Sequence, residues 1–333
     1  MLSIVSQKAP IDLPTAWSNQ EAGDLSSAGA NGGLEALHAP TAKIVHQLKQ
    51  ARLRLERASS PDLMLSPAIR ALRRTELRLD RPLRVAIFGE INSGKSSLAN
   101  LLAGIDSLPT AVISNTRVPT LLYYAREPEI WTVHASGKRE KIGSDRDMPQ
   151  RPFFRIEVGL PSARLRAIQI LDLPGLSSSR SGGSVVDLAP HQVDAALWCT
   201  MSTQAWKETE RTAWSLLPAR VHARGVLVST HRDLLPDPGD RRKLLARLRQ
   251  EVGASFRSIV LVSTLDALAV MGKGQKGLAG AAWIASGAEA LEAALGALVT
   301  DLRERRAAAA IRTTSRIAQR ALLRVDGLSA PAR

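Results

Sequence analysis

Short apolar runs occupy the middle of the chain and predict the strands of a buried sheet. Between Leu83 and about Thr264 these runs are LRVAIF, TLLYYA, FFRIEVGL, AIQILDL, AALWCTM, GVLVST and IVLVST. Several are apolar without alternation, which is typical of strands covered on both faces in a mainly parallel sheet. The stretches KSSLANLLAG, KETERTAWSLL and RRKLLARLRQEV between them are amphipathic and predict helices. We therefore expect an α/β fold with a mainly parallel sheet and helices on both faces.

Helical patterns flank this central segment on both sides. Apolar residues recur on one stripe after Pro40 and again after Ser66, and both stretches predict amphipathic helices. Beyond the last strand, the stretch MGKGQKGLAGAAW predicts a loop, and a long helix follows from about Gly287 into the 320s. The apolar seam of that helix is Leu291, Leu295, Leu298 and Leu302. The expected division is a disordered arm at 1–33, N-terminal helices at 34–82, the α/β domain at 83–285 and a basic C-terminal helix at 286–333.

The charge of the chain is strongly positive. It has 45 Lys and Arg against 31 Asp and Glu, a formal net charge of +14. Such an excess favours nucleic acid, an anionic membrane surface or an acidic protein as a partner, although a coding bias towards Arg gives the same balance. In the C-terminal helix one basic ridge is formed by Arg312, Arg316, Arg320 and Arg324. We keep two interpretations of this ridge: a solvated helix face, and a docking surface for phosphate groups or an acidic protein.

Other features of the sequence exclude several classes of site. The single cysteine, Cys199, lies in the predicted strand AALWCTM, so we expect a small buried hydrophobic residue there. The six histidines show no metal-ligand spacing, and the GxGxxG match at 272–277 has no capped helix or later acidic residue. The start of the sequence has no signal-like pattern, and no window approaches the ~20 apolar residues that a membrane span needs. We expect a cytoplasmic protein, with peripheral membrane association as an alternative.

The stretch GEINSGKS at residues 89–96 fits the phosphate-binding pattern GxxxxGK[ST] between a predicted strand and a predicted helix. Its glycines let the backbone curl so that successive N–H groups point at the β-phosphate, and the helix that follows adds its positive end. Lys95 neutralises charge on the β- and γ-phosphates, and the Ser96 hydroxyl is placed to bind Mg²⁺. We predict a nucleoside triphosphate site whose phosphate-side residues are Gly89, Asn92, Ser93, Gly94, Lys95, Ser96 and Ser97.

A second motif, ILDLPGL at residues 170–176, supplies D-x-x-G after a predicted strand. We expect Asp172 to hold the Mg²⁺ shell and the Gly175 backbone N–H to sense the γ-phosphate. Between the two motifs, in LPTAVISNTRVPT, Thr116 is our candidate to reach the metal and the γ-phosphate. Thr110 and Thr120 are the weaker alternatives in that stretch.

The stretch GVLVSTHRDLL places Thr230, His231 and Asp233 at the end of a predicted strand. A carboxylate here accepts the N1 and N2 hydrogens of guanine, which adenine does not offer, so the motif favours GTP. The expected form is [NT]-K-x-D, in which the Lys stem covers the base, and His231 stands at the Lys position. Stacking on the base must then come from an imidazole or from elsewhere. Ser263, at the end of the last predicted strand, is a further candidate to line the base.

The order of GEINSGKSS, LPTAVISNTRVP, LDLPGL and THRD resembles the GTPase domain of the dynamin superfamily, particularly its bacterial dynamin-like members. Three details narrow the match beyond small GTPases in general: the second serine, Ser97; Thr116 followed by Arg and then Pro119; and Leu173 inside the D-x-x-G motif. The resemblance covers roughly residues 83–265. It implies a P-loop GTPase fold that dimerises across its nucleotide face, with the flanking helices packed as a small bundle.

This chain departs from that pattern at Ile91. In dynamins proper this position is often a glutamine that helps to place the attacking water, whereas bacterial relatives often have an apolar residue. An isoleucine neither donates nor accepts a hydrogen bond. We therefore expect Thr116 and the backbone to order the attacking water.

Three functional hypotheses follow. The first is a Mg²⁺-dependent enzyme that binds GTP and GDP, hydrolyses GTP, and is activated by dimerisation through its nucleotide face or by a partner. Here Lys95 and Thr116 act in catalysis, while Ser96, Thr116 and Asp172 hold the metal. The second is a ribosome- or RNA-associated GTP-binding switch, which the charge of +14 and the basic ridge favour. The third is a weakly hydrolysing scaffold for a larger dynamin-like protein.

Overall fold

The computed structural model describes residues 45–46, 48–50, 52–53, 56, 66–108, 118–143, 152–175, 193–272 and 280–329, with side chains in the last helix as far as residue 317. The chain divides into two compact units, one containing residues 83–295 and the other residues 32–82 and 296–333. The arm expected at 1–33 and the candidate Thr116 lie outside the described residues.

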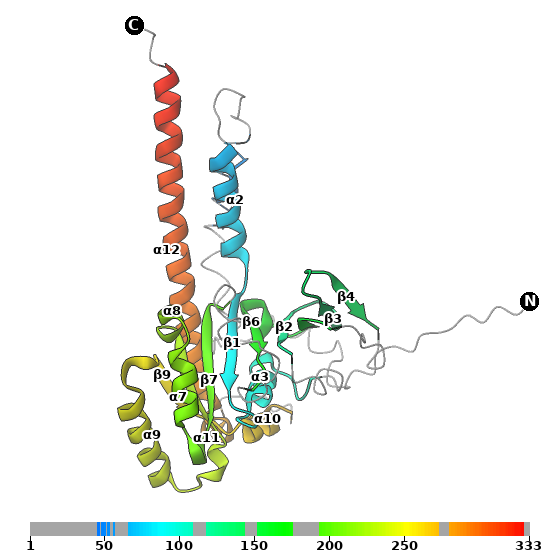
Figure 1. Ribbon diagram of the computed structural model, residues 1–333, viewed down its shortest axis with the longest axis vertical. Coiled ribbons are helices and arrows are strands. Elements are labelled where there is room, and N and C mark those ends of the chain that lie inside the picture. The colour runs from blue at the N-terminus through cyan, green and yellow to red at the C-terminus, as the bar shows by residue number, and fades with distance from the viewer. Residues whose placement is uncertain are drawn as a thin grey trace, which may run out of the picture. The chain divides into compact units, whose positions relative to one another are not determined.

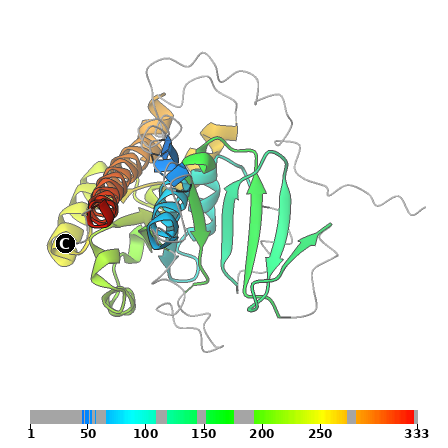
Figure 2. The same cartoon turned by 90° about the horizontal axis from the view of Figure 1, so that it is seen from above.

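Among the described residues, nine strands of the first unit form one sheet in the order β4-β3-β5-β2-β6-β1-β7-β8-β9 (Figure 1). The strands are β1 (Leu83–Gly89), β2 (Thr120–Tyr124), β3 (Glu129–Val133), β4 (Arg139–Ile142), β5 (Arg155–Leu160), β6 (Ile168–Asp172), β7 (Ala195–Met201), β8 (Gly225–Thr230) and β9 (Ser258–Leu261). The ladders from β6 through β1, β7 and β8 to β9 are all parallel. β2 pairs with β6 in the antiparallel sense, and beyond it β5, β3 and β4 extend the sheet to one side (Figure 2).

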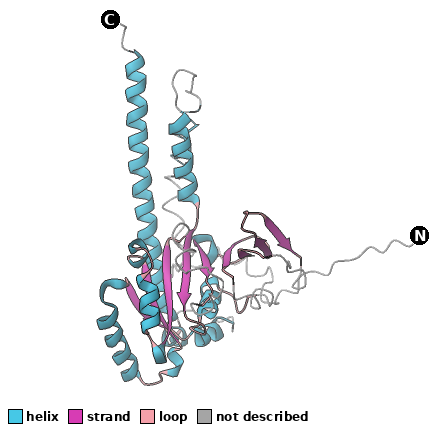
Figure 3. Cartoon of the chain, in the orientation of Figure 1, coloured by secondary structure: helices cyan, strands magenta, loops and turns pink. Residues whose placement is uncertain are grey.

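The helices of this unit cover both faces of the parallel strands (Figure 3). They are α3 (Lys95–Ala103), α5 (Arg164–Ala167), α7 (Glu208–Ser215), α8 (Ala219–His222), α9 (Pro238–Val252), α10 (Thr264–Gly272), α11 (Ala281–Ser286) and the first turns of α12 (Ala288–Ser329), with short 3₁₀ turns η7 (Ser202–Gln204), η8 (Arg232–Leu234) and η9 (Gly253–Ser255). β1 alternates between the two faces: Phe88 faces a core that includes Trp198, Trp214 and Phe256, and Ile87 faces the other way. Phe88 and Trp198 stack with ring centroids 6.2 Å apart. Burial on both faces explains why these strands are apolar without alternation.

The sequence prediction was incomplete at two places in this unit. β3 and β4 were not predicted. EIWTV begins with a charged residue and buries only three of its five residues, and REKI buries only Ile142. The loop expected after the last strand was too long. The two ends of the stretch MGKGQKGLAGAAW, residues 271–272 and 281–283, belong to the helices α10 and α11, and the part at 273–279 lies outside the described residues.

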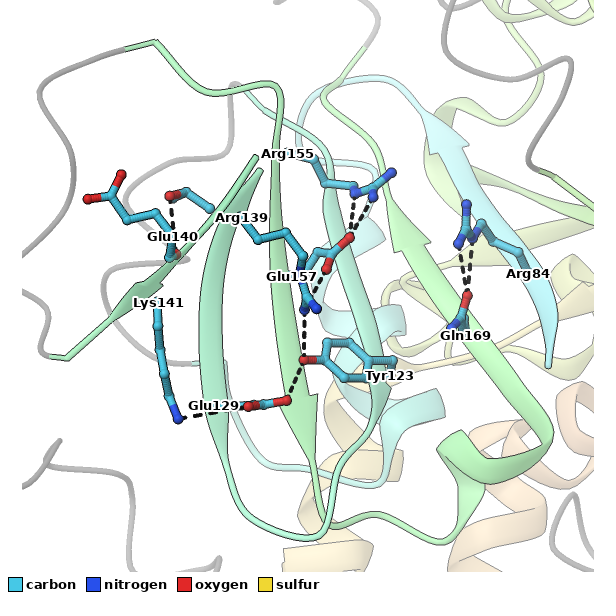
Figure 4. Close-up of polar contacts among 10 residues, drawn as sticks. Arg84, Tyr123, Glu129, Arg139, Glu140, Lys141, Arg155, Glu157 and Gln169 are labelled. Atoms are coloured by element: carbon cyan, nitrogen blue, oxygen red, sulfur yellow. Dashed lines mark hydrogen bonds and ion pairs between the residues drawn. The ribbon is translucent and has the colours of Figure 1, made fainter. Parts of the chain in front are cut away.

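One face of the sheet extension carries a network of charged side chains (Figure 4). The Glu157 carboxylate lies between two guanidinium groups, with Arg155 Nε at 3.0 Å and Arg139 Nη2 at 2.9 Å. The Tyr123 hydroxyl donates to Glu129 Oε1 at 2.6 Å. That bond, more than any other contact, holds the pKa of Glu129 below its ordinary value, and burial raises the pKa of Tyr123. The network compensates the charge that three neighbouring strands place on one face.

The second unit is helical in its described residues. It contains the helical residues between 45 and 56, α2 (Ser66–Asp80) and the part of α12 from Gly296. Its core is formed by Leu48, Leu72, Leu79 and Ala310. Arg306 Nη1 donates to the carbonyl oxygen of Arg81 at 3.0 Å, just beyond the end of α2. This contact satisfies a carbonyl group at a helix C-terminus, where such groups have no partner within the helix.

The apolar seam expected for α12 is confirmed by burial, and the basic ridge is described in part. The seam residues Leu291, Leu295, Leu298 and Leu302 are all buried, and from the predicted basic ridge Arg312 and Arg316 are exposed. The side chains of Arg320 and Arg324 lie outside the described part. Among the described helices, none combines the length and the apolar character that crossing a bilayer requires.

Candidate nucleotide site

The loop between β1 and α3 is built by two glycines in unusual backbone conformations. Gly89 has φ 143°, and a Cβ atom there would lie 2.3 Å from the carbonyl oxygen of Cys199 on β7. Gly94, with φ 84°, is the residue before α3. A side chain at either position would be strained, so the glycines of the motif are needed for this curl. The curl leaves the first N–H groups of α3 at the mouth of a cavity, where an anion binds favourably.

Two side-chain hydrogen bonds, from Lys95 and from Thr230, hold the backbone of the phosphate loop. Lys95 is 8% exposed, and its Nζ donates to the carbonyl oxygen of Glu90 at 2.5 Å. Burial lowers the pKa of Lys95, and the charges of Asp172 and Glu90 oppose that shift. Thr230, which is fully buried at the end of β8, donates its hydroxyl proton to the carbonyl oxygen of Ser93 at 2.7 Å. The Lys95 side chain is therefore already bound to the loop without a ligand.

The ends of β6 and the start of α3 bring together the two predicted metal-holding side chains. Ser96 Oγ donates to Asp172 Oδ2 at 2.8 Å. The other carboxylate oxygen, Oδ1, is buried and has no hydrogen-bond partner among the described residues. Burial raises the pKa of Asp172 to about 6, against the lowering effects of Ser96 and Lys95.

This pair fits Mg²⁺. A buried carboxylate oxygen without a partner and an adjacent hydroxyl are hard oxygen donors, and Mg²⁺ at nucleotide sites takes one or two such protein ligands, with phosphate oxygens and waters completing the shell. Among the described residues there is no group of three or more His, Cys, Asp or Glu side chains that could hold a metal ion without a substrate. The third predicted ligand, Thr116, lies outside the described residues.

A cavity of about 490 Å³ lies over the phosphate loop. Eight of the predicted nucleotide residues line it: Asn92, Gly94, Lys95, Ser96, Ser97, Asp172, Gly175 and His231. Its volume lies in the range of small-molecule sites. Four further residues line the cavity: Leu108, Val118 and Leu173, which no motif pointed to, and Thr120, which was a weaker alternative to Thr116. An apolar residue beside a motif carries no signal that separates a cavity wall from the core.

Ile91 and Gly175 form a close contact between the phosphate loop and the D-x-x-G loop. A Cβ atom on Gly175 would lie 2.6 Å from Ile91 Cγ1 and 2.8 Å from the Ile91 backbone nitrogen. Glycine is therefore the residue that this approach permits. Ile91 is 51% exposed and lines the cavity. Its side chain has no polar atom that could bind a water molecule.

The T-H-R-D motif is only partly at the cavity. His231 has φ 56°, lines the cavity, and has its Nδ1 2.9 Å from the Thr230 hydroxyl. Thr230 itself lies behind the wall, as do Gly89 and Ser93, so these three support the site rather than line it. Asp233, in the turn η8, is exposed and outside the described lining.

Ser263, the predicted candidate to line the base, is buried at the start of α10. Its side chain is 1% exposed and its Oγ accepts a hydrogen bond from the backbone N–H of Asp266 at 3.2 Å. Ser263 therefore caps the first turn of α10 and is not part of the described cavity wall. A serine between a strand and a helix is also a favourable N-cap residue, so the place of Ser263 in the sequence fits either role.

Comparison with known proteins confirms the resemblance found in the motifs. Residues 85–230 match the model of the dynamin family. Dynamin-like protein 2 of Campylobacter jejuni subsp. jejuni serotype O:23/36 (strain 81-176) is 30% identical over 142 residues, 40% of this chain and 23% of that protein. Isoniazid-induced protein IniC of Mycobacterium tuberculosis (strain ATCC 25618 / H37Rv) is 33% identical over 116 residues, 32% of this chain and 24% of the relative. The matched segment thus spans about a quarter of these relatives.

The fold agrees with a solved structure of a bacterial dynamin pair, described as providing a mechanism for the long range sensing and tethering of membranes. The superposition has a TM-score of 0.50 at 18% sequence identity and covers 86% of this chain and 44% of that chain. At this identity the likeness shows the fold alone. The α/β fold of a P-loop GTPase, expected from the sequence, is confirmed.

Proposed function

We propose that the dynamin-like segment at residues 85–230 makes this chain a Mg²⁺-dependent enzyme that binds GTP and hydrolyses it to GDP and phosphate. The observation that carries the proposal is the joint position of Lys95, Ser96 and Asp172 at one cavity, although Asp172 lies 76 residues after Ser96 in the sequence. A phosphate loop with its lysine and a carboxylate–hydroxyl pair for Mg²⁺ is the arrangement by which P-loop NTPases transfer a phosphoryl group to water.

Each group has a separate role in this proposal. The N–H groups of the loop and the first turn of α3 bind the β-phosphate, and the Lys95 ammonium group balances charge on the β- and γ-phosphates. The Gly175 backbone N–H binds the γ-phosphate. Ser96, Asp172 and Thr116 hold Mg²⁺, which when bound neutralises charge on the β- and γ-phosphates. Thr116 and the backbone orient the attacking water, because the Ile91 side chain has no polar atom.

Guanine selection is assigned to Asp233, whose carboxylate accepts the N1 and N2 hydrogens of that base. The turn η8 follows β8 directly, and its Arg232 N–H donates to the carbonyl oxygen of Val262 at 3.3 Å, so the turn lies against the end of β9. The His231 ring, at the cavity wall, covers one face of the purine in place of a lysine stem.

Turnover with purified protein tests the proposal. We expect phosphate release from GTP, dependent on Mg²⁺, and a loss of about 100-fold or more in Lys95→Ala, because a buried charge aimed at the phosphates is removed. A matched control is Lys243→Ala, which removes an exposed lysine of α9 that pairs with Asp240. Equal, non-zero rates in the wild type and Lys95→Ala would place the activity at another site or in a contaminant.

We also propose that two copies pair through the nucleotide face. Three exposed large hydrophobic side chains support this: Ile91, Leu234 and Leu265 follow the carboxyl ends of β1, β8 and β9. The carboxyl ends of parallel strands lie at one edge of a sheet, so these side chains share the edge that holds the cavity. Exposed apolar groups that gather at one edge are typical of an interaction surface.

The exposed Arg312 and Arg316 favour a second candidate function, in which α12 docks an anionic surface and GTP acts as a switch. Anionic vesicles and RNA are the two probes. Binding to RNA that falls steeply with salt and is lost in Arg312→Glu/Arg316→Glu would support the ribosome- or RNA-associated alternative. Binding to anionic vesicles with the same loss would support peripheral membrane association.

A further inference from the structure

The phosphate loop contains an acidic side chain, Glu90, at its second position. A carboxylate in a loop that binds a triphosphate is unfavourable for the ligand, because like charges repel within a few ångströms of one another. The Glu90 carboxylate has two partners on the start of α7. Lys207 Nζ lies 3.0 Å from Oε2, and Thr209 Oγ1 donates to Oε1 at 2.5 Å.

The backbone that carries these two partners is anchored to the core. Glu210, which is 2% exposed, accepts hydrogen bonds from the Lys207 backbone N–H at 2.9 Å and from Thr200 Oγ1 at 2.8 Å. Its other oxygen accepts from Trp198 Nε1 at 3.2 Å in the aromatic core. The first turn of α7 is therefore fixed to β7, and Lys207 and Thr209 meet Glu90 from a constrained position.

The direction of the Glu90 side chain agrees with these contacts. The residues on its carboxyl side, Ile91 and Asn92, line the cavity, whereas Glu90 is not part of the described lining. The hydrogen bond from Thr209, with help from the charges of Lys207 and Lys95, holds the pKa of Glu90 below its ordinary value. The carboxylate is thus ionised, held away from the cavity, and still close enough to Lys95 to affect it electrostatically.

We propose that Lys207 is a positioning and charge-compensating residue for the nucleotide: it neutralises Glu90 and keeps that carboxylate off the phosphates, so that the charge of Lys95 remains available to the ligand. The inference rests on the proposed function, because it concerns nucleotide binding at the same cavity. It predicts an effect through Glu90, so removing the carboxylate must cancel the effect of removing the lysine.

The experiment is a double-mutant cycle with a non-hydrolysable GTP analogue and GDP, measured by calorimetry. Lys207→Met is expected to weaken binding of the analogue about tenfold, because an uncompensated charge acts on the ligand at short range. The loss for GDP is smaller because GDP carries less negative charge. Glu90→Gln/Lys207→Met is expected to bind the analogue within about twofold of Glu90→Gln alone, and Lys207→Arg to bind like the wild type.

The controls separate this effect from instability and from net charge. Lys243→Met removes one positive charge from an exposed site, where the side chain is 81% exposed, and is expected to bind like the wild type. The ratio of the two dissociation constants does not depend on the folded fraction, so partial unfolding of a variant does not mimic the result. The loss in Lys207→Met is also expected to shrink at high salt, because screening weakens charge interactions.

Two outcomes overturn the inference: Lys207→Met that binds both nucleotides like Lys243→Met, or a double variant that binds the analogue as weakly as Lys207→Met. If the wild type binds GTP, either result refutes only the role of Lys207 and leaves the proposed function intact. A wild type that binds neither nucleotide refutes the proposed function instead.

Discussion

The Thr230 hydroxyl connects the two sides of the proposed nucleotide site. It donates to the carbonyl oxygen of Ser93 at 2.7 Å, lies 3.2 Å from the carbonyl oxygen of Thr200, and is 2.9 Å from His231 Nδ1. One buried hydroxyl thus holds the phosphate loop and orients the ring at the cavity wall.

Thr230→Val tests that connection. The variant keeps the shape of the side chain but leaves the Ser93 carbonyl and His231 Nδ1 without their partner, so we expect a loss of ~1–2 kcal/mol in the free energy of unfolding. We also expect about tenfold weaker GTP binding, because the loop is no longer fixed. Urea unfolding and calorimetry measure the two effects, and Thr230→Ser, which keeps the hydroxyl, is the control. Unchanged binding in Thr230→Val would show that the loop does not need this contact.

Asp233→Asn tests the assignment of the base contact. The asparagine amide replaces one acceptor by an N–H donor, so guanine loses a hydrogen bond and meets a donor opposite its own. We expect guanine nucleotides to bind about 10- to 100-fold more weakly, and xanthosine nucleotides, which have a carbonyl oxygen at that position, to bind better than to the wild type. Competition binding with GDP and xanthosine diphosphate measures the exchange. A variant with unaltered preference would remove Asp233 from the site.

At the scale of single residues, the sequence motifs identified most residues that line the cavity. They did not predict which side chains hold the phosphate loop in place. Lys95, Ser96 and Asp172 were predicted from spacing, because their chemistry defines the motif. The anchoring of Glu90 by Lys207 was not predicted, since 117 residues separate them and an ion pair between distant exposed side chains leaves no local pattern. The contact of Ser263 with the base stays a prediction; the structure shows its Oγ at the N-terminus of α10, outside the described lining of the cavity.

Among the elements, the sheet extension differs most from the parallel strands. One of its faces carries the network of Glu157, Arg139, Arg155, Tyr123 and Glu129. The parallel strands were predictable because burial on both faces makes them continuously apolar. β3 and β4 were not, because β3 buries only three of its five residues and β4 only one of its four, so neither segment is continuously apolar. Strand pairing of this kind depends on context more than on intrinsic propensity.

The Glu129 carboxylate gives this extension a defined pH dependence. Its pKa in the folded chain is depressed, so it contributes stability that is present above its unfolded value, near 4.5, and is lost as the pH falls through the folded value. We expect the wild type to be more stable than Glu129→Gln by less than about 1 kcal/mol at pH 6–8 and to lose that advantage below pH 4.5. Urea unfolding across this range measures it. An advantage that persists at pH 3 would contradict the assigned shift.

For the whole molecule, the nucleotide edge of the sheet is the surface with a proposed partner, a second copy of the chain. Ile91, Leu234 and Leu265 are 51%, 53% and 63% exposed there. The fold class was predictable from the order of strands and motifs, and the match at residues 85–230 confirms the family resemblance. Pairing across this edge was expected from the family resemblance alone. The exposed hydrophobic residues that support the proposal were not identified from the sequence, because only the fold brings Ile91, Leu234 and Leu265 to one edge.

Sizing of the purified chain tests this pairing. We expect a monomer without nucleotide and with GDP, and a dimer with GDP and a transition-state mimic of the γ-phosphate, because the mimic orders the loops that carry Ile91 and Gly175. Leu234→Asp/Leu265→Asp is expected to abolish the dimer by placing charges in an apolar contact, without loss of GDP binding. Elution at the size of a monomer under all conditions, including the transition-state mimic, would contradict the pairing.

The central claim is that one cavity binds the polyphosphate of a guanine nucleotide through Lys95 and the Ser96–Asp172 pair. Calorimetric titration of the wild type and Lys95→Ala with GTP, GDP and ATP, each with and without Mg²⁺, tests it most directly. The account predicts saturable binding of GTP and GDP that Mg²⁺ strengthens for GTP, little binding of ATP, and a large loss in Lys95→Ala. Folded wild-type protein that takes up neither guanine nucleotide, with or without Mg²⁺, would contradict it.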